Sequence, residues 1–83
     1  MNDKIRNSDD VLPYIQKYSK YRQEHFGLIC LNSERKVTFC KVLFIGAEHG
    51  TVVYPKILFW KACEKKASDI IVFHNHPSQN TQP

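Results

Sequence analysis

Hydrophobic residues near the start of the chain recur with the spacing of a helix. The pattern predicts a helix over residues 10–22 whose apolar face is formed by Val11, Leu12, Ile15 and Tyr18. Pro13 falls in the first turn of this helix, where a missing backbone N–H costs little. The residues before it, 1–9, are mostly polar, and we expect them to be flexible.

From residue 24 the spacing changes to the alternation that is typical of β-strands. Phe26, Leu28 and Cys30 fall on one side of an extended segment. A second apolar run extends from Val37 to Ile45, and the polar residues 32–35 between the two runs predict a turn. We therefore expect an antiparallel hairpin, then a loop at residues 47–50 and a short extended piece over residues 51–54.

The rest of the chain predicts a helix followed by a strand. Pro55 is suited to the first turn of a helix, and apolar residues up to position 67 lie on one side of it. The β-branched run at residues 70–73 predicts a buried strand. A strand–helix–strand unit after a hairpin favours a single domain over residues 1–83, of the α/β or α+β layered class, with a mixed β-sheet flanked by helices.

Composition limits the kind of protein further. The chain has 83 residues and a net charge of +4, and its basic residues are spread along its length, so attraction to nucleic acid should be weak. No stretch reaches the ~20 apolar residues of a membrane helix, and we expect a cytoplasmic protein without a membrane partner. The three cysteines, Cys30, Cys40 and Cys63, are widely spaced and are expected to be reduced.

Two histidines follow the last predicted strand, just before Pro77 ends it. Residues i and i+2 of an extended segment point to the same side, so His74 and His76 can face one metal ion. Two neutral imidazoles suit zinc, although a catalytic zinc site normally has three protein ligands and a water. The spacing thus predicts part of a zinc site, with a loop or capping role for the histidines as the alternative.

The run IVFHNHPS at residues 71–78 resembles the signature of the JAB/MPN (JAMM) metalloprotease fold, in its bacterial RadC-like branch. Two more segments agree with it: QEHFGL at residues 23–28, which opens the first predicted strand, and TVVYPK at residues 51–56, which leads into the second helix. The resemblance spans residues 11–83. It implies the N-terminal part of a JAB/MPN fold, which is cytidine-deaminase-like.

The resemblance also implies roles for three residues. Members of this family bind zinc through two histidines and an aspartate, and a glutamate of the first strand activates water. Carried over, His74 and His76 are metal ligands and Glu24 is the general base. Periodicity alone favours a simpler interpretation of Glu24, as a solvent-facing residue at the start of a strand.

The family pattern extends past the end of this sequence. Its serine and its aspartate ligand would fall beyond Pro83, so we expect a C-terminally truncated domain with a half-built site. Zinc would then bind weakly or not at all, and activity would be weak or absent. Substitutes for the third ligand are His25, His49, Asp69 or a residue of a second molecule.

Three functions follow from these features. The first is a zinc-dependent metallohydrolase or peptidase that cuts a peptide or a similar amide. The second is a non-catalytic module that forms a homodimer through apolar surface and an uncovered sheet edge. The third is a DNA-binding, DNA-repair-associated role, suggested by the basic pI of about 9.1 and by the traditional description of RadC-like proteins.

Overall fold

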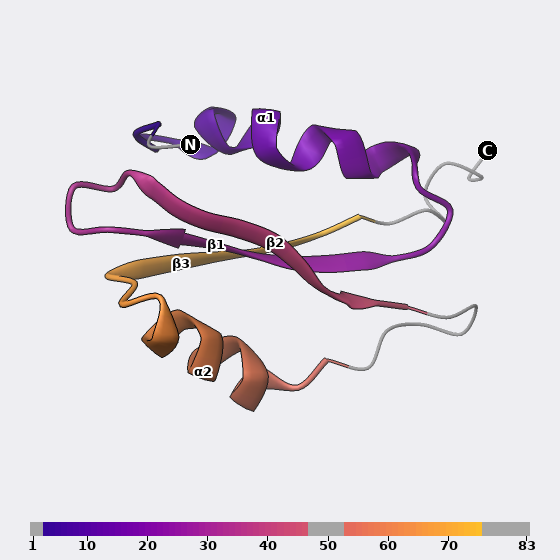
Figure 1. Ribbon diagram of the computed structural model, residues 1–83. Helices are drawn as coiled ribbons and strands as arrows, with labels where there is room; N and C mark the ends of the chain where they lie inside the picture. Colours follow the sequence, from indigo (N-terminus) through magenta and orange to yellow (C-terminus); the bar gives the residue numbers. More distant parts are fainter. Residues whose placement is uncertain (1–2, 47–52, 76–83) are drawn as a thin grey trace.

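The computed structural model describes residues 3–46 and 53–75, which form one sheet with helices on both faces (Figure 1). In chain order the elements are η1 (Ser8–Val11), α1 (Leu12–Ile15), η2 (Gln16–Lys20), β1 (His25–Leu31), β2 (Val37–Ile45), α2 (Pro55–Glu64) and β3 (Asp69–His74). The first three elements follow one another without a break and cover one face of the sheet, and α2 covers the other. The predicted α+β layered class is confirmed.

The central strand of the sheet is β1, because the strand order is β2-β1-β3. Both pairs are antiparallel, and Phe26 of β1 pairs with Phe44 on one side and with His74 on the other. The predicted hairpin is therefore confirmed. The expected mixed sheet, with parallel as well as antiparallel pairs, is not found among the described strands. Helix α2 carries the chain across β1, so that β3 pairs with β1 and not with β2.

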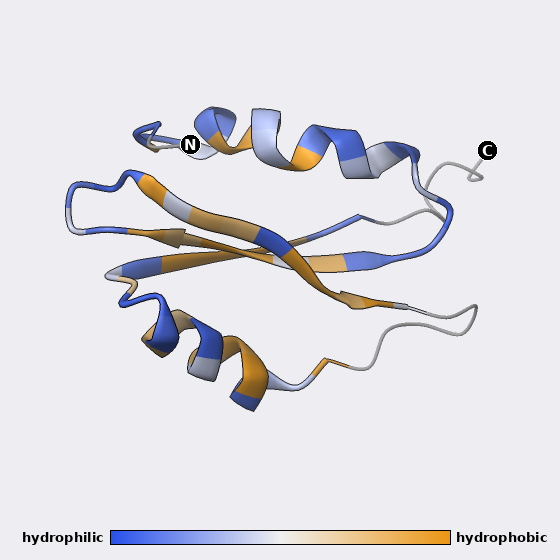
Figure 2. Ribbon diagram, in the orientation of Figure 1, coloured by the Kyte–Doolittle hydropathy of each residue, from blue (hydrophilic) through white to orange (hydrophobic). Residues whose placement is uncertain are grey.

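Side chains of β1 are buried on both faces of the sheet. Leu28 and Cys30 pack with Leu58 of α2, whereas Ile29 and Leu31 pack with the N-terminal helical segment. Figure 2 shows the same arrangement, with apolar residues following the strands between the two helical layers. Because β1 is packed closely on both faces, it cannot shift without disturbing both helical layers. The core packing therefore holds the start of β1 in place.

The N-terminal segment contributes to the core over its described residues 3–9, although the sequence predicts that it is flexible. Ile5 is only 2% exposed. Its N–H donates to the carbonyl of Arg35 at 2.8 Å, and the N–H of Val37 donates to the carbonyl of Asp3 at 2.9 Å. The segment therefore lies along the hairpin turn, an arrangement that depends on residues 30 or more positions later in the chain.

The first helical segment differs from the predicted helix at residues 10–22. It begins earlier, because Asn7 Oδ1 accepts a hydrogen bond from the N–H of Asp9 at 3.0 Å and caps the start. Only four of its residues are α-helical, and the tighter 3₁₀ turns flank them. The Ser19 hydroxyl donates to the carbonyl of Gln16 at 2.8 Å, and the backbone is extended at Tyr21. The chain reaches β1 four residues later.

The second half of the chain follows the prediction closely. Helix α2 begins at Pro55 as expected and ends at Glu64, and β3 is one residue longer at each end than the predicted 70–73, so that His74 belongs to the strand. Of the short extended piece at 51–54, residues 51–52 lie outside the described ranges, and Val53 and Tyr54 are not in a strand. Within those ranges no helix is long and apolar enough to cross a lipid bilayer.

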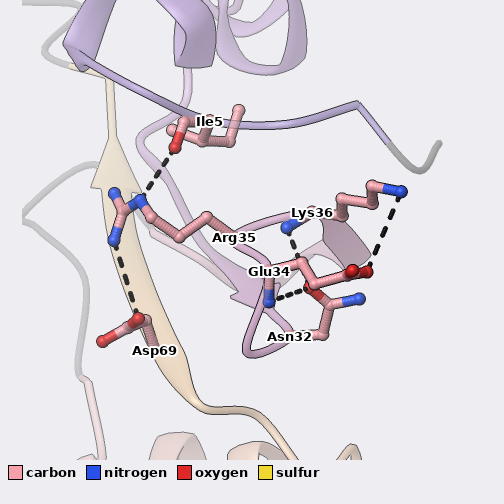
Figure 3. A network of polar contacts seen from close by, with 6 residues as sticks. All are labelled: Ile5, Asn32, Glu34, Arg35, Lys36 and Asp69. Atoms are coloured by element: carbon pink, nitrogen blue, oxygen red, sulfur yellow. Dashed lines mark hydrogen bonds and ion pairs between the residues drawn. The ribbon is translucent and has the colours of Figure 1, made fainter.

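Polar contacts close one end of the sheet, where the hairpin turn meets the start of β3 (Figure 3). Arg35 Nε donates to the carbonyl of Ile5 at 2.8 Å, and Arg35 Nη1 lies 3.6 Å from Asp69 Oδ2. Asn32 Oδ1 accepts two backbone N–H groups within the turn, at 2.9 and 3.0 Å. Glu24 and His74, two of the residues predicted to form the functional site, lie at the opposite end, where β1 begins and β3 ends.

Candidate metal-binding and catalytic site

His74 is the last residue of β3, and its side chain is exposed. The imidazole stacks on the ring of Phe26, its partner in β1, with ring centroids 5.5 Å apart and planes inclined by 13°. Phe26 packs against the cluster that contains Leu58 of α2, so the imidazole lies on the α2 side of the sheet. The strand thus presents an accessible imidazole whose orientation is set by an aromatic neighbour.

Glu24 comes one residue before β1 and is half-buried. Its carbonyl accepts a hydrogen bond from the N–H of Gly46 at 2.7 Å, which continues the pairing of β1 with β2. Because side chains alternate along a strand, Glu24 lies on the same face as Phe26. Glu24 and His74 therefore belong to adjacent strands, at the same end of the sheet and on the same face.

His25 points to the other face, as expected from its position next to Glu24. Its ring lies 4.5 Å from that of Tyr21 and 5.9 Å from that of Tyr18, measured between centroids, and His25 is only 9% exposed. Its Nδ1 atom is 2.8 Å from the carbonyl oxygen of Gln23. These contacts give His25 a packing role between the sheet and the end of η2, and they exclude it as a third ligand beside His74.

Asp69 is also excluded as a ligand in the same molecule. It begins β3, whereas His74 ends it, and five residues of strand span roughly 16 Å. Its carboxylate lies near Arg35 in the contacts of Figure 3. His76 and His49 lie outside the described residues.

Within residues 3–46 and 53–75, no three His, Cys, Asp or Glu side chains lie together in a way that could hold a metal ion. A complete ligand set therefore needs a residue from outside these ranges. The accessible imidazole of His74 fits one position of such a set, and the carboxylate of Glu24 has the chemistry of a base on the neighbouring strand.

Asn75 is a residue of this region that sequence reasoning missed. Its side-chain amide bonds to the backbone of four residues in the segment that leads into β1: Tyr18, Tyr21, Gln23 and His25. The available signal in the sequence was the position of Asn75 between two histidines. Because side chains alternate along a strand, Asn75 is directed to the opposite face from its neighbours. Its partners lie 50 or more positions earlier in the chain, beyond the reach of local patterns.

Comparison with known proteins agrees with the motifs. The family model described as "RadC-like JAB domain" matches residues 5–83. A UPF0758 protein of Geobacillus sp. (strain WCH70) is 36% identical over 80 residues, which make up 95% of this chain and 35% of the relative. A UPF0758 protein of Chlorobium phaeovibrioides is 34% identical over 83 residues, or 99% of this chain and 37% of the relative. The chain thus spans little more than a third of the length of these relatives.

Proposed function

Because the chain belongs to the RadC-like JAB domain family, we propose that it carries part of a zinc-dependent hydrolase site. In this proposal His74 and His76 are metal ligands and Glu24 is the general base. The observation that carries the proposal is the placement of His74 at the end of β3, directly beside the start of β1, which Glu24 precedes on the same face.

The division of roles between strands has a physical reason. A general base must reach a water molecule near the metal without occupying a ligand position, so it is best supplied by a neighbouring element. Bound zinc would lower the pKa of such a water to about 7. Glu24 would then accept the proton from the water as it attacks a carbonyl carbon. The substrate class that suits this chemistry is a peptide or a similar amide.

The ligand set stays incomplete in this proposal. His74 and His76 supply two of the three protein ligands that a catalytic zinc site normally has. Among residues 1–83, the positions of His25 and Asp69 leave His49 as the candidate for the third ligand, with a residue of a second molecule as the alternative. We therefore expect weak zinc binding and slow turnover from the 83-residue chain.

Zinc titration against a competing chromophoric chelator tests the ligand assignment. We expect His74→Ala and His76→Ala each to lower the zinc affinity at least tenfold, since each removes a metal bond. Asp69→Asn is the matched control, because it alters an acidic residue at the far end of β3, and it should leave the affinity unchanged. Equal zinc affinity of His74→Ala and the unmodified chain would refute the assignment.

Peptide hydrolysis in the presence of zinc tests Glu24. We expect Glu24→Gln to keep the zinc affinity and to lower turnover by roughly 10²- to 10⁴-fold, the usual contribution of a general base. Glu34→Gln serves as the control, because Glu34 is an exposed glutamate in the hairpin turn. A Glu24→Gln variant that turns over as fast as the control would show that the glutamate is not the base.

A second candidate is a non-catalytic module that forms a homodimer. Its support is the apolar surface of α2 and β3, where the exposed residues are Ile57 (42%), Phe59 (62%), Trp60 (64%) and Val72 (40%). β3 is also an edge strand of the described sheet, and an open edge can pair with another chain. Sedimentation should then show a dimer that Trp60→Lys weakens, and a monomer at all concentrations would count against this function.

A further inference from the structure

Asn75 binds both peptide groups that flank Glu24. The carbonyl of Gln23, in the peptide group before Glu24, accepts a hydrogen bond from Asn75 Nδ2 at 3.1 Å. The N–H of His25, in the peptide group after Glu24, donates to Asn75 Oδ1. The main-chain N–H of Asn75 also donates to the carbonyl of His25, at 3.3 Å. A single side chain therefore fixes the backbone on both sides of the candidate base.

The same amide also binds the end of the helical segment. Asn75 Nδ2 donates to the carbonyl of Tyr18 at 2.9 Å and to that of Tyr21 at 3.2 Å. The carbonyl of Tyr18 also accepts the N–H of Tyr21, at 3.2 Å, so the amide adds a second contact to the turn that ends the helical segment. Because Oδ1 meets an N–H group and Nδ2 meets only carbonyl oxygens, one orientation of the amide fits, and its two N–H groups are shared among the three carbonyl oxygens.

From these contacts we propose that Asn75 is a positioning residue, which sets the direction of the Glu24 side chain relative to His74. It is the neighbour of His74 in sequence, and its amide reaches the backbone on both sides of Glu24. The inference rests on the proposed hydrolase site, because the direction of the Glu24 side chain matters for function if Glu24 is the base. The effect of Asn75 on the positions of Glu24 and His74 can nevertheless be tested without metal. An aspartate at position 75 lacks the N–H donors, and a glutamine is one methylene too long for the same contacts.

The experiment compares Asn75→Ala with Asn32→Ala in the 83-residue chain. Asn32 is a matched control, because its side chain also binds two backbone groups, in the hairpin turn at the opposite end of the sheet. Both variants are studied at a temperature at which each is folded. We expect Asn75→Ala to lower peptide turnover in the presence of zinc by about 10- to 100-fold, the usual effect of losing a group that orients the residues of a metal site, and Asn32→Ala to leave it unchanged.

A second measurement needs no metal. Stacking on Phe26 should shift the NMR signals of the His74 ring, and the Glu24 amide belongs to the peptide group whose carbonyl, that of Gln23, binds Asn75. Asn75→Ala should move both sets of signals toward those of an unstructured chain, whereas Asn32→Ala should leave them in place. If Asn75→Ala does not fold, Asn75→Asp replaces it, since it keeps an acceptor for the His25 N–H and loses the N–H donors that the three carbonyl oxygens share.

The two measurements separate the inference from the proposed function. If the unmodified chain binds no zinc, the hydrolase site is refuted, and the NMR comparison still decides the role of Asn75. Signals of Glu24 and His74 that are the same in the Asn75 variant and in the unmodified chain would overturn the inference. If the unmodified chain hydrolyses the peptide, equal turnover of these two proteins in the presence of zinc would overturn it as well.

Discussion

The ring of Phe73 lies directly over Gly27, its partner in the β1–β3 register. A methyl group added to Gly27 would overlap three atoms of this ring. Phe73 is 6% exposed and belongs to the core cluster on the side of the N-terminal helical segment. The lack of a side chain at position 27 is therefore what allows a large aromatic residue to stand next to His74.

Gly27→Ala should destabilise the protein by about 1–3 kcal/mol, the usual cost of overfilling a packed core. The ring cannot rotate away freely, because its neighbours are buried. Urea unfolding measures the loss. Phe73→Leu in the same chain removes the outer ring atoms, so the double variant should lose less stability than the sum of the two single variants. A stability of Gly27→Ala equal to that of the unmodified chain would disprove the close packing.

Much of this region could be predicted from local sequence. The β-branched run before His74 predicts a strand, and this is confirmed, whereas the metal that the spacing of His74 and His76 suggests stays a prediction. The proposed role of Glu24 as a base rests on the family resemblance, because a glutamate at the start of a strand is usually only a surface residue.

Other features depend on contacts that no local pattern records. Ile5 is one apolar residue in a polar run, and it is buried only because the hairpin turn returns to it. Asn75 was missed for a similar reason, since its partners lie far away in the sequence. The pairing of β3 with β1 instead of β2 depends on where α2 crosses the sheet, which hydrophobic spacing cannot show.

The contact between Tyr14 and Asp3 predicts a pH dependence in the alkaline range. The Tyr14 hydroxyl donates to Asp3 Oδ2 at 2.8 Å. Burial of the ring, together with this hydrogen bond, raises the pKa of Tyr14 from 10.0 to about 12. The unfolded chain therefore loses this proton first, so the stabilisation is complete below pH 10 and is lost as the pH rises to about 12.

Urea unfolding at a series of alkaline pH values checks this expectation. Tyr14→Phe should remove the part of the pH dependence that Tyr14 causes, and Tyr54→Phe is the control for an exposed tyrosine. If both variants show the same alkaline dependence as the unmodified chain, the contact with Asp3 does not set the pKa of Tyr14.

The three cysteines should differ strongly in reactivity. Cys63 is exposed, Cys40 is half-buried and Cys30 is 0% exposed. Burial raises the pKa of the Cys30 and Cys40 thiols, and the thiolate is the reactive form. A thiol reagent followed by mass spectrometry should therefore modify Cys63 first and Cys30 only as the protein unfolds. Cys63→Ser should abolish the fast phase, and early modification of Cys30 would show that β1 is not tightly buried.

Lys66 occupies a backbone position that favours glycine. It follows the C-cap of α2 with φ of 52°, in the left-handed region. Its N–H donates to the carbonyl of Cys63, and the N–H of Ala67 donates to that of Ala62, each at 3.0 Å. This is the Schellman arrangement, in which glycine avoids the steric cost of a side chain. Lys66→Gly should therefore stabilise the protein by about 1 kcal/mol.

Two comparisons show whether backbone strain is the cause of this gain. Lys65→Gly changes the same residue type at φ of −87°, where glycine brings no relief, and it also removes an amine 4.9 Å from the centre of the Phe39 ring. It should destabilise the protein. Arg35 has a similar positive φ of 63°, but Arg35→Gly would lose the hydrogen bond to Ile5. The gain in unfolding free energy from Arg35→Gly should therefore be smaller than the gain from Lys66→Gly. The reverse order, measured by urea unfolding, would refute the strain argument.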